Sequence, residues 1–256
     1  MSKTLVLYVF HEYNNRVEHF IHHCIFKDNN VDFIIICNNK DTNFKFPSYV
    51  SVLFRDNIGY DFGGWSDALI TYDLYKKYDH FIFGNSSIIG PYLHSTFQGK
   101  WTDVYIQGLQ NNIKLFGSTI NTCEQPLTHS HVQSYLFVMD KITLQYLIDC
   151  EIFSITNYAN SYVDAIWNKE VLMSRKIIEN GWNIGSCMTY YKYVDFTFKT
   201  KQPHEYEKPF LDNVMRDSSC RNIIWNEYEL VFIKGNKEIN ISLPNYSEKM
   251  KLNLEI

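Results

Sequence analysis

The chain has 256 residues, with 24 Lys and Arg against 28 Asp and Glu, a formal net charge of -4 and 45% hydrophobic residues. These values indicate one large globular domain and disfavour a nucleic-acid partner, because a dense basic face is missing. No apolar run approaches the roughly 18 residues that cross a bilayer, and the N-terminal run from Leu5 to Phe10 is too short for a signal peptide. The sequence therefore predicts a cytoplasmic protein without a transmembrane segment.

Strands and helices alternate in the first third of the chain. Two amphipathic helices are predicted by apolar stripes, the first running from Val17 to Ile25 and the second from Trp65 to Tyr75. The predicted strands are short, nearly continuous apolar runs, at residues 4–10, 31–37, 50–54 and 79–84. Strand, helix, strand, strand, helix, strand is the order of a Rossmann-like α/β sheet.

The rest of the chain is less regular but continues the same pattern. A helical stripe over residues 163–180 stops at Gly181, a natural C-terminal cap. The other predicted elements are a helix at 142–148 and strands at 115–118, 133–139, 183–188 and 229–233. Because the sequence turns polar and irregular from Lys234, we expect a single domain over residues 1–236 and a polar tail over 237–256.

Polar residues follow the predicted strands, and in α/β sheets ligands bind at the carboxyl ends of strands. The candidates after the first, second and fourth strands are Phe10, His11, Glu12, Asn38, Asn85, Ser86 and Ser87. Asn and Ser side chains bind pyrophosphate or sugar hydroxyls, whereas a divalent cation prefers carboxylates. The alternative is that residues 85–87 form only a polar turn before Gly90 and Pro91.

The segment after the third strand, RDNIGYDFGGW, combines glycines with directed polar side chains. Glycines permit unusual backbone angles and close approach of a ligand, and the segment leads into a helix whose first amides favour an anion. The candidates here are Arg55, Asn57, Gly59, Asp61, Gly63 and Gly64. The alternative is a tight turn in which Asp61 only caps the helix.

Glu170 is the first catalytic candidate. At 100° per residue it falls on the apolar side of the helix predicted at 163–180, together with Ser174. A carboxylate aimed at that side either lines a cleft, where it can act as a general base, or pairs with a cation such as Arg175 or Arg216.

Histidines supply the second catalytic candidate. His131 precedes a predicted strand on which His131 and Gln133 share a face. The spacing of His19, His22 and His23 is compatible with a metal, but solvent-facing histidines beside the apolar stripe are the favoured interpretation.

Five ordered motifs resemble the rhamnan-synthesis F-type glycosyltransferases and their relatives in polysaccharide gene clusters and large DNA viruses. They are DNIGYDFGGWSDAL (56–69), FIFGNSSIIGPYL (81–93), HVQSYLFVMD (131–140), NKEVLMSRKIIENGWNIG (168–185) and WNEYELVFIKGN (225–236). The resemblance implies a GT-A fold, a Rossmann-like, mixed but mostly parallel sheet flanked by helices. It also implies that a nucleotide-sugar binds at the strand ends and gives its sugar to an acceptor hydroxyl.

The resemblance also implies roles for individual residues. Those after the first strand, with Asn38, would hold the nucleobase and ribose, and Asn57, Gly59 and Asp61 would complete the donor pocket. Residues 85–87 occupy the place of a D-x-D motif, but Ser86 replaces the Asp that close relatives carry. A Mg²⁺ or Mn²⁺ cofactor is therefore left open.

The sequence thus predicts a glycosyltransferase that moves rhamnose or another hexose or deoxyhexose from a UDP-, GDP- or dTDP-linked donor to a glycan acceptor, with inversion. Glu170, or alternatively His131, would be the base. The rival from another class is a non-catalytic nucleotide-sugar or glycan-binding protein on the same fold. A nucleotidyltransferase is less favoured, because no Gly-rich, Lys-containing loop follows the first strand.

Overall fold

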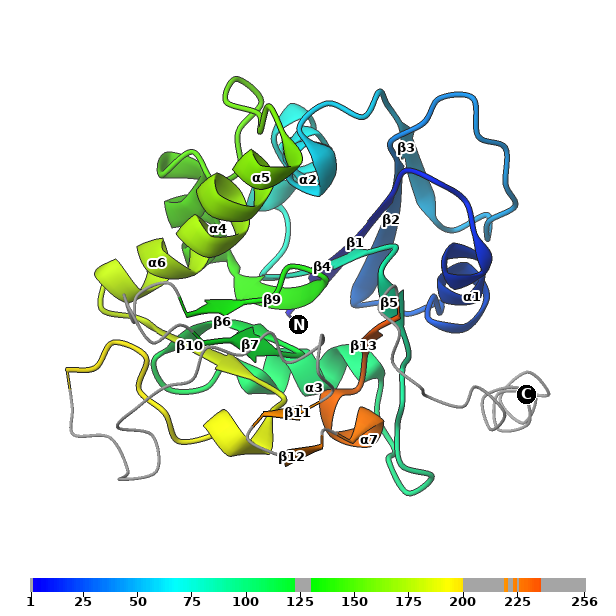
Figure 1. The fold of residues 1–256 in the computed structure, drawn as a ribbon. Helices are drawn as coiled ribbons and strands as arrows, with labels where there is room; N and C mark the ends of the chain where they lie inside the picture. Colours follow the sequence, from blue (N-terminus) through cyan, green and yellow to red (C-terminus); the bar gives the residue numbers. More distant parts are fainter. Residues whose placement is uncertain (1, 123–129, 200–218, 221–222, 225, 236–256) are drawn as a thin grey trace.

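The computed structural model of the chain describes residues 2–122, 130–199, 219–220, 223–224 and 226–235. The predicted tail, 237–256, lies outside the described residues. The centre is a seven-stranded sheet in the order β10-β6-β9-β4-β1-β2-β3, with helices on both faces (Figure 1). This is the predicted GT-A-like arrangement.

The first half of the sheet is parallel and regular. The strand β1 (Thr4–Phe10) lies between β2 (Val31–Cys37) and β4 (His80–Asn85), and β3 (Ser51–Phe54) extends the sheet beyond β2. All seven residues of β1 are buried, as a central strand covered on both faces requires. The four predicted strands of this half are confirmed.

The second half is mixed. The strand β9 (Leu136–Asp140) runs antiparallel to both β4 and β6 (Ile113–Gly117), and β10 (Asn183–Ser186) pairs parallel with β6 at the edge. The predicted strand at 133–139 thus begins three residues later than expected.

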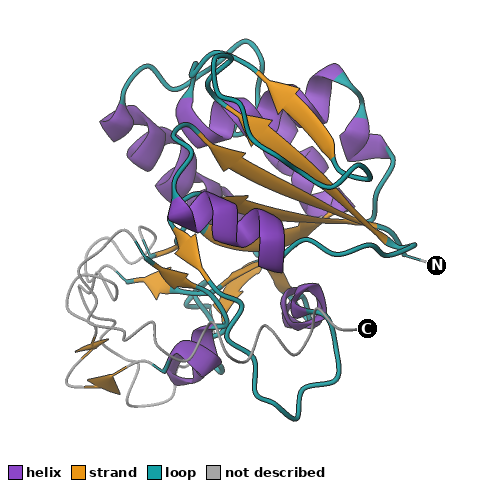
Figure 2. Ribbon diagram, turned by 90° about the vertical axis from the view of Figure 1, so that its right-hand side faces the viewer, coloured by secondary structure: helices purple, strands orange, loops and turns teal. Residues whose placement is uncertain are grey.

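Helices cover both faces of the sheet (Figures 1 and 2). On one face α2 (Tyr60–Thr71), α4 (Lys141–Asp149) and α6 (Leu172–Glu179) pack against the strands, and on the other face lie α1 (Asn15–His23) and α3 (Trp101–Gly108). Aromatic rings fill the interfaces. Trp65 of α2 meets Phe83 and Phe137, which stack on each other with centroids 4.7 Å apart.

Short elements connect these layers. They are η1 (Leu74–Lys76), β5 (Ile88–Ile89), β7 (Ile120–Asn121), β8 (His131–Val132), η4 (Thr189–Tyr191), β11 (Ser219–Cys220), β12 (Ile223–Ile224), α7 (Glu227–Leu230) and β13 (Ile233–Lys234). The prediction of a strand at 229–233 is wrong in its first half, because Asn226 caps a helical turn by accepting a hydrogen bond from the Tyr228 amide.

The helix predicted at 163–180 is divided by a wider turn. The structure has α5 (Tyr162–Ala165), the π-helical turn η3 (Ile166–Val171) and then α6. A π turn interrupts the 3.6-residue period, so the two halves of the predicted apolar stripe separate. Val163 and Trp167 are 61% and 52% exposed, whereas Lys169 is buried with its Nζ donating to the carbonyls of Glu151 and Asn157.

The pairing of β13 with β5 brings the end of the described chain to the segment that follows β4. Lys234 lies opposite Ile88, and the Gly235 amide donates to the Ser87 carbonyl over 2.7 Å. This pairing adds residues 233–235 to the polar edge of the sheet.

Among the residues that the structure describes, no helix is long and apolar enough to cross a membrane.

Candidate functional site

Arg55 is the centre of a closed hydrogen-bond network at the carboxyl ends of β2 and β3. Its guanidinium donates to the Asp67 carboxylate over 2.7 Å, to Asn38 Oδ1 over 2.8 Å and to the Ile58 carbonyl over 2.7 Å. Asn38 in turn donates to Asn57 Oδ1. Arg55 and Asn38 are buried, and their polar atoms are engaged within the protein, so they shape the site from beneath.

The glycine-rich segment is folded into the start of α2. Gly59 caps the helix in the left-handed region, with φ 74°. Gly63 and Gly64 lie within the helix, where a Cβ at Gly63 would stand 2.0 Å from the Ile58 carbonyl oxygen and one at Gly64 would stand 2.9 Å from Val9. The turn before α2 thus requires Gly63, and close packing of α2 on the sheet requires Gly64.

Asp61 and Asn85 join the start of α2 to the end of β4. Asn85 Nδ2 donates to Asp61 Oδ2 over 2.9 Å, and Asn85 Oδ1 accepts from the Ser87 amide. No side chain caps α2, so the alternative in which Asp61 serves as the helix cap is wrong. Burial, followed by the charge of Glu170, raises the pKa of Asp61 to about 6, while Asn85 and Lys234 act in the opposite direction.

Glu170 lies in the π turn and reaches toward the segment before β9. Its Oε1 accepts from the Ser134 amide over 3.2 Å and lies 3.9 Å from His131 Nε2, and both side chains are 16% exposed. Glu170 Oε2 has no hydrogen-bond partner within the described ranges. The alternative of a pair with Arg175 is wrong, because Arg175 binds Glu179; Arg216 lies outside the described residues.

The two catalytic candidates are therefore neighbours, and they face the donor candidates. The charge of Glu170 acts on Asp61, which places the π turn, the start of α2 and the end of β4 around one region. Ser174, which shares the face of Glu170, accepts from the Val132 amide and helps to fix the segment that carries His131.

The remaining donor candidates lie around this region with different exposure. His11 Nδ1 donates to the Asn38 carbonyl over 2.9 Å, and Glu12 is exposed. The Phe10 side chain is fully buried and packs against Phe44, so only its backbone faces the strand ends. Ser86 and Ser87 are half-buried.

Two basic residues not anticipated from the sequence border residues 85–87. Arg16 Nε donates to the Ser86 carbonyl over 2.9 Å. Lys234 follows from the β13 pairing, and its charge acts on Asp61. Arg16 had a sequence signal, since it lies in the first turn of the helix after β1. Lys234 belongs to the motif at 225–236, but its position beside residues 85–87 depends on a pairing partner that is remote in sequence.

Residues 85–87, the candidate metal position, contain no carboxylate. Across the described ranges, no group of three or more His, Cys, Asp or Glu side chains is arranged to hold a metal ion. At residues 85–87 the Asn85 oxygen is engaged by the Ser87 amide and the Asn85 nitrogen by Asp61. The histidines of α1 are equally unsuited, because His19 bonds to the Gly90 carbonyl.

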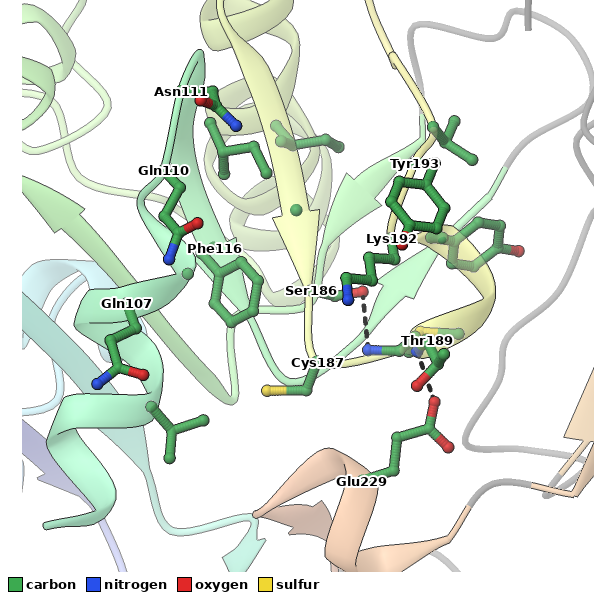
Figure 3. Close-up of a pocket in the computed structure, with 18 residues that line it drawn as sticks. Gln107, Gln110, Asn111, Phe116, Ser186, Cys187, Thr189, Lys192, Tyr193 and Glu229 are labelled. Atoms are coloured by element: carbon green, nitrogen blue, oxygen red, sulfur yellow. Dashed lines mark hydrogen bonds between the residues drawn. The ribbon is translucent and has the colours of Figure 1, made fainter. Parts of the chain in front are cut away.

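A separate cavity of about 690 Å³ lies between α3, β10 and α7 (Figure 3). Gln107, Phe116, Ser186, Lys192 and Glu229 are among its lining residues. It shares no residue with the candidate site, so it is a distinct feature of the β6–β10 edge.

Comparison with known families agrees with the resemblance of the motifs. The family model described as rhamnan synthesis protein F (RgpF) matches residues 33–217, well over half of the chain. The chain belongs to the rhamnan synthesis protein F family. Membership connects it with polysaccharide synthesis and a glycosyltransferase-type role, as the motifs predicted. None of the curated protein sequences matches the chain.

The matched region contains the Arg55 network, Asp61, Asn85 and Glu170, which all lie within the family's span. Arg16 and Lys234 lie outside it.

Proposed function

We propose that this member of the rhamnan synthesis protein F family is an inverting glycosyltransferase. It takes a sugar, rhamnose or another hexose or deoxyhexose, from a UDP-, GDP- or dTDP-linked donor and transfers it to a glycan hydroxyl. The observation that carries the proposal is Glu170, whose carboxylate is fixed by one oxygen beside His131 while it faces Asp61 and Asn85 at the strand ends.

Glu170 is the general base of the proposed reaction. Its Oε1 is oriented by the Ser134 amide, and Oε2 is available to accept the proton of an acceptor hydroxyl. The acceptor oxygen attacks the anomeric carbon as the bond from that carbon to the diphosphate oxygen breaks. The proton passes to Glu170, and the nucleoside diphosphate leaves with the bonding electrons, so the configuration at the anomeric carbon inverts.

His131 has a positioning role in this proposal. Its Nε2 lies 3.9 Å from Glu170 Oε1, which is longer than a hydrogen bond but places the ring directly beside the carboxylate. The sequence also allows His131 to be the base, and comparison of variants at both positions distinguishes these roles.

The acceptor is proposed to approach over exposed aromatic side chains beside Glu170. Tyr162 is 67% exposed, and its ring contacts that of Tyr60 at the start of α2, with centroids 6.5 Å apart. Trp167 is 52% exposed on the π turn that carries Glu170. Aromatic rings offer the apolar face of a sugar a stacking surface at low entropic cost.

The donor is identified first by a thermal-shift screen of the protein against UDP-, GDP- and dTDP-sugars, each with and without Mn²⁺, because a ligand of the native state raises the melting temperature. Transfer to glycan acceptors and release of free sugar are then measured with the donor that binds. Glu170→Gln, which keeps the shape and the acceptor oxygen, should reduce both rates by about a hundredfold to ten-thousandfold while donor affinity stays within twofold of wild type.

The matched control is Glu179→Gln, which removes the same charge from an exposed position on α6 that is paired with Arg175 and Lys176. It should leave the rates unchanged. Loss of donor affinity in Glu170→Gln with unchanged turnover would contradict the assigned role. Donor binding without transfer or sugar release by the wild type would favour the non-catalytic sugar-nucleotide-binding protein instead.

A further inference from the structure

We propose that Arg16 and Lys234 bind the donor's diphosphate and offset its charge in place of a divalent cation. The inference rests on the proposed function, since it concerns how the same site holds a nucleotide-sugar. It adds two residues that lie outside the family match and a charge arrangement that the motifs do not contain.

Arg16 is oriented toward residues 85–87 by its own hydrogen bond. Nε donates to the Ser86 carbonyl over 2.9 Å, and the side chain is half-buried between α1 and this segment. The two terminal nitrogens of the guanidinium have no hydrogen-bond partner within the described part of the chain. A guanidinium fixed through Nε presents these nitrogens as a fork, which matches two phosphate oxygens.

Lys234 lies beside the same segment, although it is remote from Arg16 in the sequence. It pairs with Ile88 through β13, and the next residue, Gly235, donates its amide to the Ser87 carbonyl. A Cβ at Gly235 would stand 3.3 Å from Arg16 Cδ, so the Arg16 side chain passes beside the residue that follows Lys234. Two cations from separate elements therefore border one short loop at the end of β4.

The arrangement of the nearby acidic groups favours basic side chains over a divalent metal ion at this position. Asp61 is held by Asn85, and the charge of Lys234 already acts on it. Glu170 is placed across the site with one oxygen bound to the Ser134 amide. These carboxylates come from different elements and are not arranged with a third ligand around a common point in the described residues, whereas a departing diphosphate requires positive charge close to residues 85–87.

The test is calorimetric titration of the full chain with UDP, GDP and dTDP in buffer that contains EDTA. For the nucleotide that binds, the matching nucleoside is titrated as an internal control for folding of the pocket. Arg16→Gln and Lys234→Gln should each weaken diphosphate binding by about tenfold to a hundredfold, and the nucleoside should bind each variant as it binds the wild type. Lys76→Gln is the control, because Lys76 lies in η1, ahead of β4 in the chain, and forms an exposed ion pair with Asp73.

Retention of wild-type diphosphate affinity in EDTA, together with its loss in the two variants, supports the inference. Binding that disappears in EDTA and returns with Mn²⁺ overturns it, as does unchanged affinity in both variants. In these two cases the glycosyltransferase proposal survives, because Glu170-dependent transfer is measured separately. Failure of all three nucleotides to bind, with or without Mn²⁺, instead removes the proposed function on which the inference rests.

Discussion

The two halves of the sheet differ in how many hydrogen bonds hold their polar side chains. In the half formed by β1 to β4, Arg55 donates hydrogen bonds to both Asn38 and Asp67, and Tyr158 donates a further hydrogen bond to Asp67. In the half formed by β9, β6 and β10, Glu170 is held through a single oxygen by one backbone amide.

The difference separates side chains that shape a site from side chains that can react in it. A buried guanidinium in which each of the three nitrogens donates to a protein oxygen, as in Arg55, is costly to disturb. A carboxylate with one fixed oxygen is oriented and still able to accept a proton. Satisfied hydrogen bonds therefore argue for a structural role of Arg55 even though its sequence position suggested donor contact.

Disrupting the Arg55 network should produce the largest loss of stability. Arg55→Ala leaves the Asp67 carboxylate and Asn38 without their partner, and we expect the free energy of unfolding to fall by about 3–5 kcal/mol. Urea denaturation measures this change. Lys40→Ala is the matched control, since the Lys40–Asp56 pair is exposed and exposed pairs contribute about 0–1 kcal/mol. Equal losses in the two variants would mean that the network adds nothing beyond a surface ion pair.

Asp61 lies beside the end of β4, and its titration should be visible in the pH dependence of stability. Its pKa is raised to about 6 from 3.8, so the folded state binds the proton more tightly than the unfolded state does. The Asp61 contribution is fully present below pH 3.8 and is lost as the pH rises through about 6. Asp61→Asn should therefore be more stable than wild type above pH 6, by about 1–3 kcal/mol.

The measurement is chemical denaturation of both proteins across this pH range, with the difference between them as the readout. The difference is needed because His19 contributes with the opposite sign: burial, followed by the charge of His23, lowers its pKa to about 4, so its part of the stability is lost as the pH falls. A difference that does not vary with pH would contradict the raised pKa of Asp61.

The smallest effect is expected on the acceptor side. Tyr162→Ala removes an exposed ring, so stability should change by less than about 0.5 kcal/mol, while the KM for a glycan acceptor should rise about fivefold. Tyr162→Phe keeps the ring and should restore the KM. If the KM of Tyr162→Phe stays as high as that of Tyr162→Ala, the hydroxyl group contacts the acceptor, and hydrogen bonding replaces stacking in the proposal.

The parallel half of the fold was predictable because each of its elements has a local signal. The run Thr4–Phe10 is apolar throughout, and a covered central strand requires nothing else. The π turn was not predictable from periodicity, since the sequence from 163 to 180 fits an uninterrupted helix. Lys169 is an example. Its Nζ donates to the backbone carbonyls of Glu151 and Asn157, and the position of the loop that contains them depends on the tertiary fold.

The candidate site was predicted in location more than in detail. Asn85 and Asp61 were both named, but their hydrogen bond joins two elements 24 residues apart in sequence, and no spacing rule gives it. Gly63 and Gly64 were interpreted as a ligand-facing loop, whereas the Ile58 carbonyl in the turn before α2 explains Gly63 and the packing of α2 against Val9 explains Gly64. Arg16 and Lys234 required the arrangement of backbones at the end of β4.

The pairing of β5 with β13 also has a consequence for biosynthesis. It connects Ile88 with Lys234, so the closing contact waits until nearly the whole domain has been synthesised, and the entropic cost of joining such distant segments must be met by native contacts. A nascent chain that has formed β1 to β4 already carries Asp61 and Asn85 but lacks the amine of Lys234. With the proposed diphosphate site, competence to bind an anionic nucleotide is thus acquired only after β13 has been synthesised.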